Sequence, residues 1–190
     1  MAGERAGSAG NGLSPWLIPA VLVIAGGAAL GVIRYYAGSP HEPESSLADV
    51  AFAAPSCTAG VLAVAGILMG HRGLVIGAGF ALFPISVVSF VMLPLLVPAA
   101  LLVAYAATLR GTGGALDFAE AALVAVGLPV AFFALLIHDD PATWHSGTSS
   151  GSTSDIVTTF EATLSLAITA VVAATAALSL WIGARPRVTR

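Results

Sequence analysis

The chain of 190 residues is 57% hydrophobic and only 9% charged, and its mean hydropathy is +0.94. Because soluble domains average about 25% charged residues, this chain lacks the polar surface needed to face water on all sides, and we expect an integral membrane protein. Its 7 basic residues, all arginine, oppose 10 acidic ones, so the net charge of -3 argues against nucleic-acid binding, which needs a basic face.

The first 36 residues predict a polar arm followed by a membrane span. Residues 1–14 are small and polar, which is typical of a disordered segment. The apolar run over 15–36 predicts the first span, with Trp16 at one membrane interface and Tyr35 and Tyr36 at the other. A cleaved signal peptide is the competing interpretation, although this run is longer than the usual apolar core of about 7–15 residues.

The next part of the chain predicts a polar loop over 37–49 and a second span over 50–70. Arg72 and Arg110 then enclose 37 uncharged residues, which as a single helix would be about 55 Å long. A bilayer core needs only about 20 residues. We therefore expect this stretch to turn back near Pro94.

The last third of the chain predicts two further spans separated by a polar loop over 138–155. The fold class is accordingly all-α, a polytopic transmembrane helical bundle over 15–184 with a basic tail at 185–190. Five crossings replace six if the stretch 73–110 is re-entrant or lies along the interface. The predicted spans are 15–36, 50–70, 73–91, 94–109, 116–137 and 156–183.

The arginines predict the orientation of this bundle. With six spans, one side of the membrane carries all of them except Arg34, namely Arg5, Arg72, Arg110, Arg185, Arg187 and Arg190. Basic residues concentrate in cytoplasmic loops. We therefore expect a multi-pass protein of the cell membrane with both termini in the cytoplasm.

Glu161 is the ionisable residue that the sequence marks for an ion or proton path. It lies about 1.5 turns inside the last predicted span, and Glu161, Ser165 and Thr169 share one helix face because they are spaced by four residues. Ionisable groups within spans commonly serve transport. The alternative is a Glu161 at the level of the lipid head groups, with hydroxyls bonded to their own helix.

Histidines and carboxylates in the predicted outer loops raise the prospect of a metal ion on the outer face. His41, His138, Asp139 and His145 supply suitable donor atoms, although their spacing matches no defined metal motif. No other cofactor is expected. Asp117 and Glu120 are interpreted mainly as acidic residues in the first turns of a helix; the alternative is a pair of carboxylates for acid–base chemistry or cation binding.

Pairs of glycines four residues apart predict close helix packing within the bundle. Small residues at this spacing let a second helix backbone approach. These glycines are Gly27, Gly31, Gly66, Gly70, Gly73 and Gly77.

The chain carries no nucleophile elbow, zinc-protease motif or phosphate-binding loop, so we do not expect an enzyme. The favoured hypothesis is an accessory or scaffolding subunit that packs against a membrane-protein partner or a second copy within the lipid bilayer. The alternatives are a small transporter or channel that uses Glu161, and a membrane enzyme with the outer metal site.

Overall fold

The computed structural model is entirely helical over the residues that it describes, which are 14–37, 45–88, 90–109, 114–136 and 159–183. The predicted all-α helical bundle is thus confirmed. Its elements are α1 (Leu17–Ala37), α2 (Ser45–Met69), α3 (Arg72–Val88), the 3₁₀ helix η1 (Phe90–Leu95), α4 (Leu96–Thr108), α5 (Ala115–Phe133) and α6 (Thr159–Gly183).

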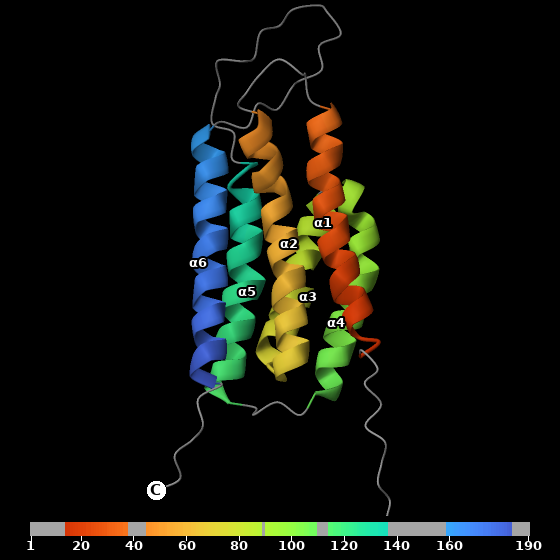
Figure 1. Ribbon diagram of the computed structural model, residues 1–190, viewed down its shortest axis with the longest axis vertical. Helices are drawn as coiled ribbons and strands as arrows, with labels where there is room; N and C mark the ends of the chain where they lie inside the picture. Colours follow the sequence, from red (N-terminus) through yellow and green to blue (C-terminus); the bar gives the residue numbers. More distant parts are fainter. Residues whose placement is uncertain (1–13, 38–44, 89, 110–113, 137–158, 184–190) are drawn as a thin grey trace, which may run out of the picture.

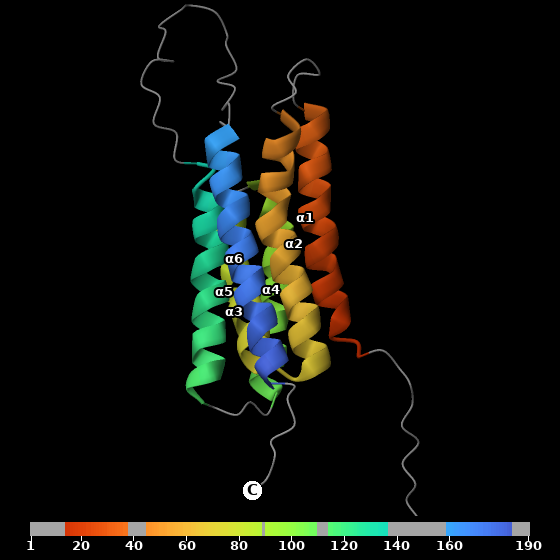
Figure 2. The same cartoon turned by 60° about the vertical axis from the view of Figure 1, so that its left-hand side comes forward.

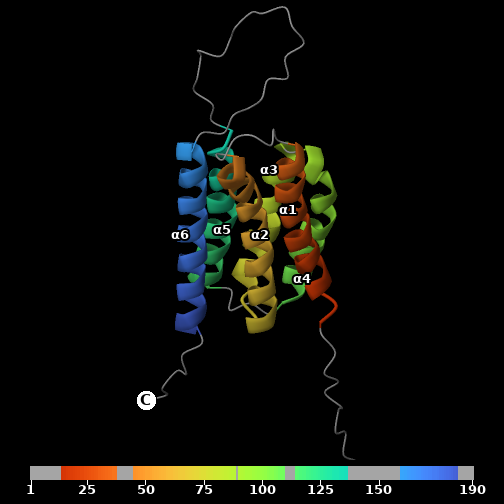
Figure 3. The ribbon, with the colours of Figure 1, turned by 45° about the horizontal axis from the view of Figure 1, so that its top comes forward.

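The helices form two layers, which Figures 1 and 2 show from two sides. α2 is the middle of the first layer and packs against α1 and α6, whereas α3 is the middle of the second and packs against α4 and α5. α2 and α3 face each other and join the layers. Figure 3 shows the same grouping from a tilted direction.

Successive helices run in opposite directions along the bundle (Figure 1). The start of α1, the turn between α2 and α3, the start of α5 and the end of α6 lie together at the bottom of Figure 1, which we call the lower end. The opposite end is the upper end. α1, α3 and α5 therefore run parallel to one another, and the first and last helices leave the bundle at the same end.

The stretch 73–110 turns back on itself, as its length predicts. α3 ends at Val88, α4 begins at Leu96, and Pro94 lies within η1 between them. The fourth predicted span is short as an α-helix, at about 20 Å for 13 residues. The six residues of η1 add about 12 Å, because a 3₁₀ helix rises by about 2.0 Å per residue.

Two helices differ from the sequence prediction by four or more residues at one end. α2 begins at Ser45, so residues 45–49 form its first turns rather than part of a polar loop. Ala48 and Asp49 are buried there, because these turns pack on the neighbouring helices despite their polar composition. α5 ends at Phe133 and not at 137, and its last carbonyls accept 3₁₀-type bonds from Leu135 and Leu136.

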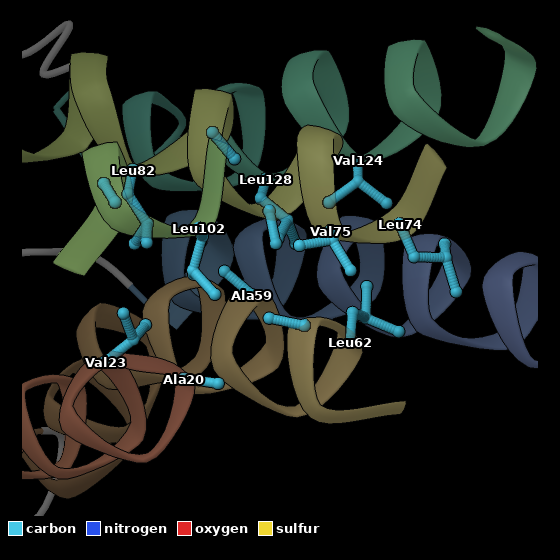
Figure 4. Close-up of a cluster of buried hydrophobic side chains, with 14 of the residues drawn as sticks. Ala20, Val23, Ala59, Leu62, Leu74, Val75, Leu82, Leu102, Val124 and Leu128 are labelled. Carbon is cyan, nitrogen blue, oxygen red and sulfur yellow. The ribbon is translucent and has the colours of Figure 1, made fainter. Parts of the chain in front are cut away.

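The core lies between the two layers and consists of aliphatic side chains (Figure 4). Alanines such as Ala20, Ala59 and Ala78 have no exposed surface, and Leu74 and Leu82 fill the space between them. Small residues let helix backbones approach closely, which is how helices associate where lipid removes the hydrophobic driving force.

Large apolar side chains also cover much of the outer surface of the bundle. Ile18, Leu68, Val97 and Phe118 are each more than 60% exposed. By length and composition, three of the described helices are long and apolar enough to cross a membrane, and they are α2, α5 and α6. The described parts of α1, α3 and the η1–α4 region are shorter apolar helices.

Candidate functional site

The tight turn between α2 and α3 positions the first residue of the candidate site. Gly70 adopts a positive φ of 73°, and the N–H of His71 donates to the carbonyl of Gly66 at 2.9 Å. A glycine with positive φ, followed by a residue whose N–H bonds to the carbonyl five residues earlier, forms the Schellman motif that ends a helix. The turn therefore places His71 at the lower end of the bundle, one residue before α3 begins.

His71 pairs with a buried carboxylate from α5. Its Nδ1 lies 3.0 Å from Oε1 of Glu120, whose side chain is only 6% exposed, whereas that of His71 is 21% exposed. An ionised Glu120 can only accept, so the proton then sits on Nδ1; a protonated carboxyl would instead donate to a bare Nδ1. In both arrangements the two groups share a proton across one hydrogen bond.

The second carboxylate oxygen of Glu120 makes the pair a candidate functional site. Oε2 is buried and finds no hydrogen-bond partner among the described residues, and the same holds for Nε of the adjacent Arg72. Buried polar atoms are normally bonded, and exceptions often mark functional positions. The arrangement provides a proton-holding group just inside the lower end of the bundle.

Glycines bring α5 and α6 close to this pair. A Cβ built on Gly73 would meet the backbone of Asp117 and would come within 2.9 Å of the Glu120 Cβ. A Cβ on Gly183, the last residue of α6, would lie 2.9 Å from Cε1 of the His71 ring. Three helices and one turn therefore enclose the His71–Glu120 pair.

Glu120 lies in the first turns of α5, where the sequence places it, but its position in the bundle gives it a contact that the sequence analysis does not predict. Its side chain is buried and bonded to His71, because the first turns of α5 pack on the glycine-rich face of α3. Asp117, three residues earlier, is partly buried and makes a polar interaction of its own. The predicted threading could have indicated the pair, since it places the turn at 71–72 and the start of α5 on the same side.

The predicted Glu161 face of α6 lies partly inside the bundle. Ser165 is fully buried and Thr169 is 5% exposed, whereas Glu161 is only half-buried and makes an interaction of its own. The Thr169 hydroxyl donates to the Ser165 carbonyl at 2.8 Å, while Oγ of Ser165 finds no partner among the described residues. The structure does not place these residues beside His71, which lies at the lower end.

The glycine pairs lie where helices come close together. A Cβ on Gly27 would be 3.0 Å from the backbone nitrogen of Cys57, and one on Gly31 would be 3.1 Å from the Ala53 Cβ. A Cβ on Gly77 would be 2.9 Å from the Ala121 carbonyl.

Gly66 and Gly70 belong to the α2–α3 turn and not to a contact between separate helices. A Cβ on Gly66 would be 2.9 Å from the carbonyl of His71, whereas one on Gly70 would meet open space.

The proposed metal ligands fall in parts of the chain that the structure does not describe. His41, His138, Asp139 and His145 all lie outside the described residues, and the outer metal site stays a prediction. Within the described ranges, no cluster of three or more His, Cys, Asp or Glu side chains could hold a metal ion.

Comparisons of this chain with protein-family models, with curated proteins and with solved structures find no match.

Proposed function

We propose that the protein crosses the cell membrane six times, with both termini in the cytoplasm, and serves as an accessory or scaffolding subunit for a membrane partner. The interfacial aromatic residues support the membrane placement. Trp16 stacks on Tyr105 at the lower end, with ring centroids 4.7 Å apart, and Tyr35 and Tyr36 lie near the upper end of α1. Trp16 and Tyr35 are separated by about 28 Å along the helix, close to the ~30 Å hydrocarbon core.

The arginines support the orientation. Arg72 begins α3 at the lower end, where α1 starts and α6 ends, whereas Arg34 lies in the last turns of α1 at the upper end. The remaining five arginines lie outside the described residues, on segments that the predicted threading assigns to the lower side. The positive-inside rule then makes the lower end cytoplasmic.

The proposal of a partner rests on one exposed face of α6. α6 packs against α5 and α2 and is the least buried of the three long apolar helices. Seven residues with alternating spacings of three and four are all exposed, with aromatic rings at both ends and small side chains between them. This α6 seam consists of Phe160, Thr163, Ala167, Ala170, Ala174, Ala177 and Trp181.

The spacing and size of these residues favour a helix as the neighbour. A sustained alternation of three and four residues keeps one face of a helix toward a partner helix. Alanine and threonine in such a face allow close backbone approach within lipid, where packing and not water exclusion drives association. The α6 seam is therefore the observation on which the scaffolding function rests.

Co-purification tests the partner. After extraction in mild detergent, we expect a stoichiometric membrane protein or a second copy of this chain to accompany the protein. Replacing Ala170 and Ala174 by leucine should dissociate the bound protein, because the two larger side chains prevent close packing of the helices. Ala29, which is exposed on α1, provides the matched control as Ala29→Leu. The proposal would be refuted by a monomer without a bound protein after extraction from native membranes. Undiminished co-purification of the bound protein with the seam variant would also refute it.

Cysteine labelling tests the membrane placement separately. Cys57 is the single cysteine and is replaced by alanine first. Cysteines introduced at Ser8 and Thr189 should react with an impermeant maleimide only in permeabilised cells, whereas one at Ser149 should react in intact cells. Labels from opposite faces at Ser8 and Thr189 would contradict an even number of crossings.

A small transporter or channel is the second candidate function. The buried Ser165 hydroxyl without a described partner favours it, because unbonded polar atoms are costly away from water and often mark a path. In reconstituted vesicles, Glu161→Gln and Ser165→Ala should each abolish proton or ion flux, whereas Ser179→Ala should not. Equal flux in all of them would remove this face from consideration.

A further inference from the structure

A groove runs along the outer surface of the bundle between the parallel helices α3 and α5. Its volume is about 390 Å³, and apolar side chains such as Ile76, Phe80, Phe118 and Ala122 line most of it. Phe80 is 50% exposed and Phe118 is 77% exposed. The groove therefore opens outward, toward the surroundings of the bundle and not toward its core.

The groove becomes polar at the lower end of the bundle. Arg72 and Gly114 line it there, at the points where α3 and α5 begin. Nε of Arg72 is buried and finds no hydrogen-bond partner among the described residues. The groove thus combines an apolar lining with a cationic side chain whose Nε has no hydrogen-bond partner among the described residues.

The charges at this end favour an anion. Because α3 and α5 run in the same direction, their N-termini lie side by side, and each contributes roughly half a positive charge. Arg72 adds a full positive charge, and Asp117, which also lines the groove, adds a full negative charge. These four contributions leave roughly one positive charge at the groove. Glu120 is bonded to His71 and is not among the residues that line the groove.

We infer that this groove binds one anionic phospholipid of the bilayer. The phosphate accepts hydrogen bonds from Arg72 and lies near the first turn of α3, and one acyl chain lies along Ile76, Phe80 and Phe118. This inference rests on the proposed membrane placement, which sets the lower end at a lipid head-group region.

The dimensions of the groove agree with one lipid leaflet. Arg72 and Phe80 are separated by about 12 Å along α3, and Gly114 and Ala125 by about 16 Å along α5. One leaflet contributes half of a hydrocarbon core of about 30 Å. The polar end lies where the head group belongs, and the apolar lining extends over the depth of the acyl chains.

The side chains that line the groove leave room for an acyl chain. Ala121, Ala122 and Ala125 line the groove on α5, and the exposed rings of Phe80 and Phe118 also line it. A flexible acyl chain fits such a lining of small side chains and aromatic rings. A phosphate at a helix start uses the backbone N–H groups that have no partner within the helix.

Native mass spectrometry of the purified protein tests the inference. Micelles of a non-ionic detergent are doped with phosphatidylglycerol or phosphatidylcholine of identical acyl chains. We expect one retained phosphatidylglycerol, with an affinity at least about tenfold higher than for phosphatidylcholine, which corresponds to ~1.4 kcal/mol. Arg72→Gln should abolish this preference, and Arg34→Gln, which removes the same charge at the upper end, should keep it.

A second pair of variants tests the apolar part. Ala122→Trp fills the groove without a change of charge and should lower phosphatidylglycerol retention about tenfold. Val126→Trp places the same bulk on an exposed position of α5 outside the groove and should retain the lipid. If Ala122→Trp does not fold, the head-group comparison and Arg72→Gln still decide the question.

Several outcomes would overturn the inference. Equal retention of both lipids, together with no effect of Arg72→Gln, would exclude a phosphate site. If lipid retention is lost only in Ala122→Trp, the groove binds apolar chains such as those of detergent without recognising a head group. Displacement of the lipid by inorganic phosphate alone indicates a site for free anions, and a doubled mass without lipid indicates a second copy. Carbonate extraction of the membranes separates the two proposals, since a membrane-resident protein without retained lipid contradicts the groove assignment alone.

Discussion

Replacing His71 by alanine should destabilise the bundle much more than replacing Glu120 by leucine. His71→Ala leaves a carboxyl group that is 6% exposed without its hydrogen-bond partner, and Oε2 of the same group already has none among the described residues. Glu120→Leu removes the buried polar group itself. The imidazole left behind is 21% exposed and can bond to water.

The expected magnitudes follow from this asymmetry. Leaving a buried hydrogen-bonding group without its partner costs about 1–3 kcal/mol, and for a chain of this size each kcal/mol lowers the melting temperature by roughly 2–4 °C. His71→Ala should therefore lower it by about 2–12 °C. Glu120→Leu should cost less than about 1 kcal/mol, because replacing a buried polar group by an apolar one of similar volume is often nearly neutral.

Thermal unfolding in one detergent, followed by tryptophan fluorescence, measures both effects. The double variant His71→Ala/Glu120→Leu provides the sharpest comparison. It should be more stable than His71→Ala alone, because the second substitution removes the carboxyl group that the first leaves unpaired. Equal losses in the two single variants, or a double variant less stable than His71→Ala, would show that burial of Glu120 does not control the stability of this end.

Two further pairs of substitutions test the packing by the same unfolding measurement. Gly73→Val should cost about 1–3 kcal/mol through overpacking against the Asp117 backbone. Gly70→Ala adds a methyl group in open space and should cost about 1–2 kcal/mol through its positive φ alone. A loss below about 0.5 kcal/mol for Gly73→Val, the size expected at an ordinary surface position, would contradict the close approach of α3 and α5. Phe132→Ala removes a side chain that is 1% exposed and should cost about 3–5 kcal/mol, whereas Phe118→Ala, at 77% exposure, should change stability by less than about 0.5 kcal/mol.

Composition and charge patterns predict the helices well. The run of 37 uncharged residues is too long for a single span, and this length alone predicts that the chain turns back between α3 and α4. The start of α2 is missed, because Ser45, Ser46 and Asp49 are typical of a loop when they are considered without their neighbours. Burial of Ala48 and Asp49 by the packed bundle outweighs that local preference.

The candidate site is predicted less well, because it depends on which side chains meet. Apolar context singles out Glu161 on α6, yet the more deeply buried glutamate is Glu120 on α5. The difference arises from Gly73, which lets the first turns of α5 lie directly against α3 and carries Glu120 to His71. No periodicity within α5 contains that information, since it requires the position of another helix.

The short connection between α2 and α3 has a consequence for how the protein is made. Only Gly70 and His71 lie between the two helices. In the proposed membrane placement, a connection this short requires α2 and α3 to enter the bilayer together as one hairpin. α3 has only 17 residues, fewer than the roughly 20 that cross a bilayer core. Lengthening the connection should therefore let α2 insert without α3.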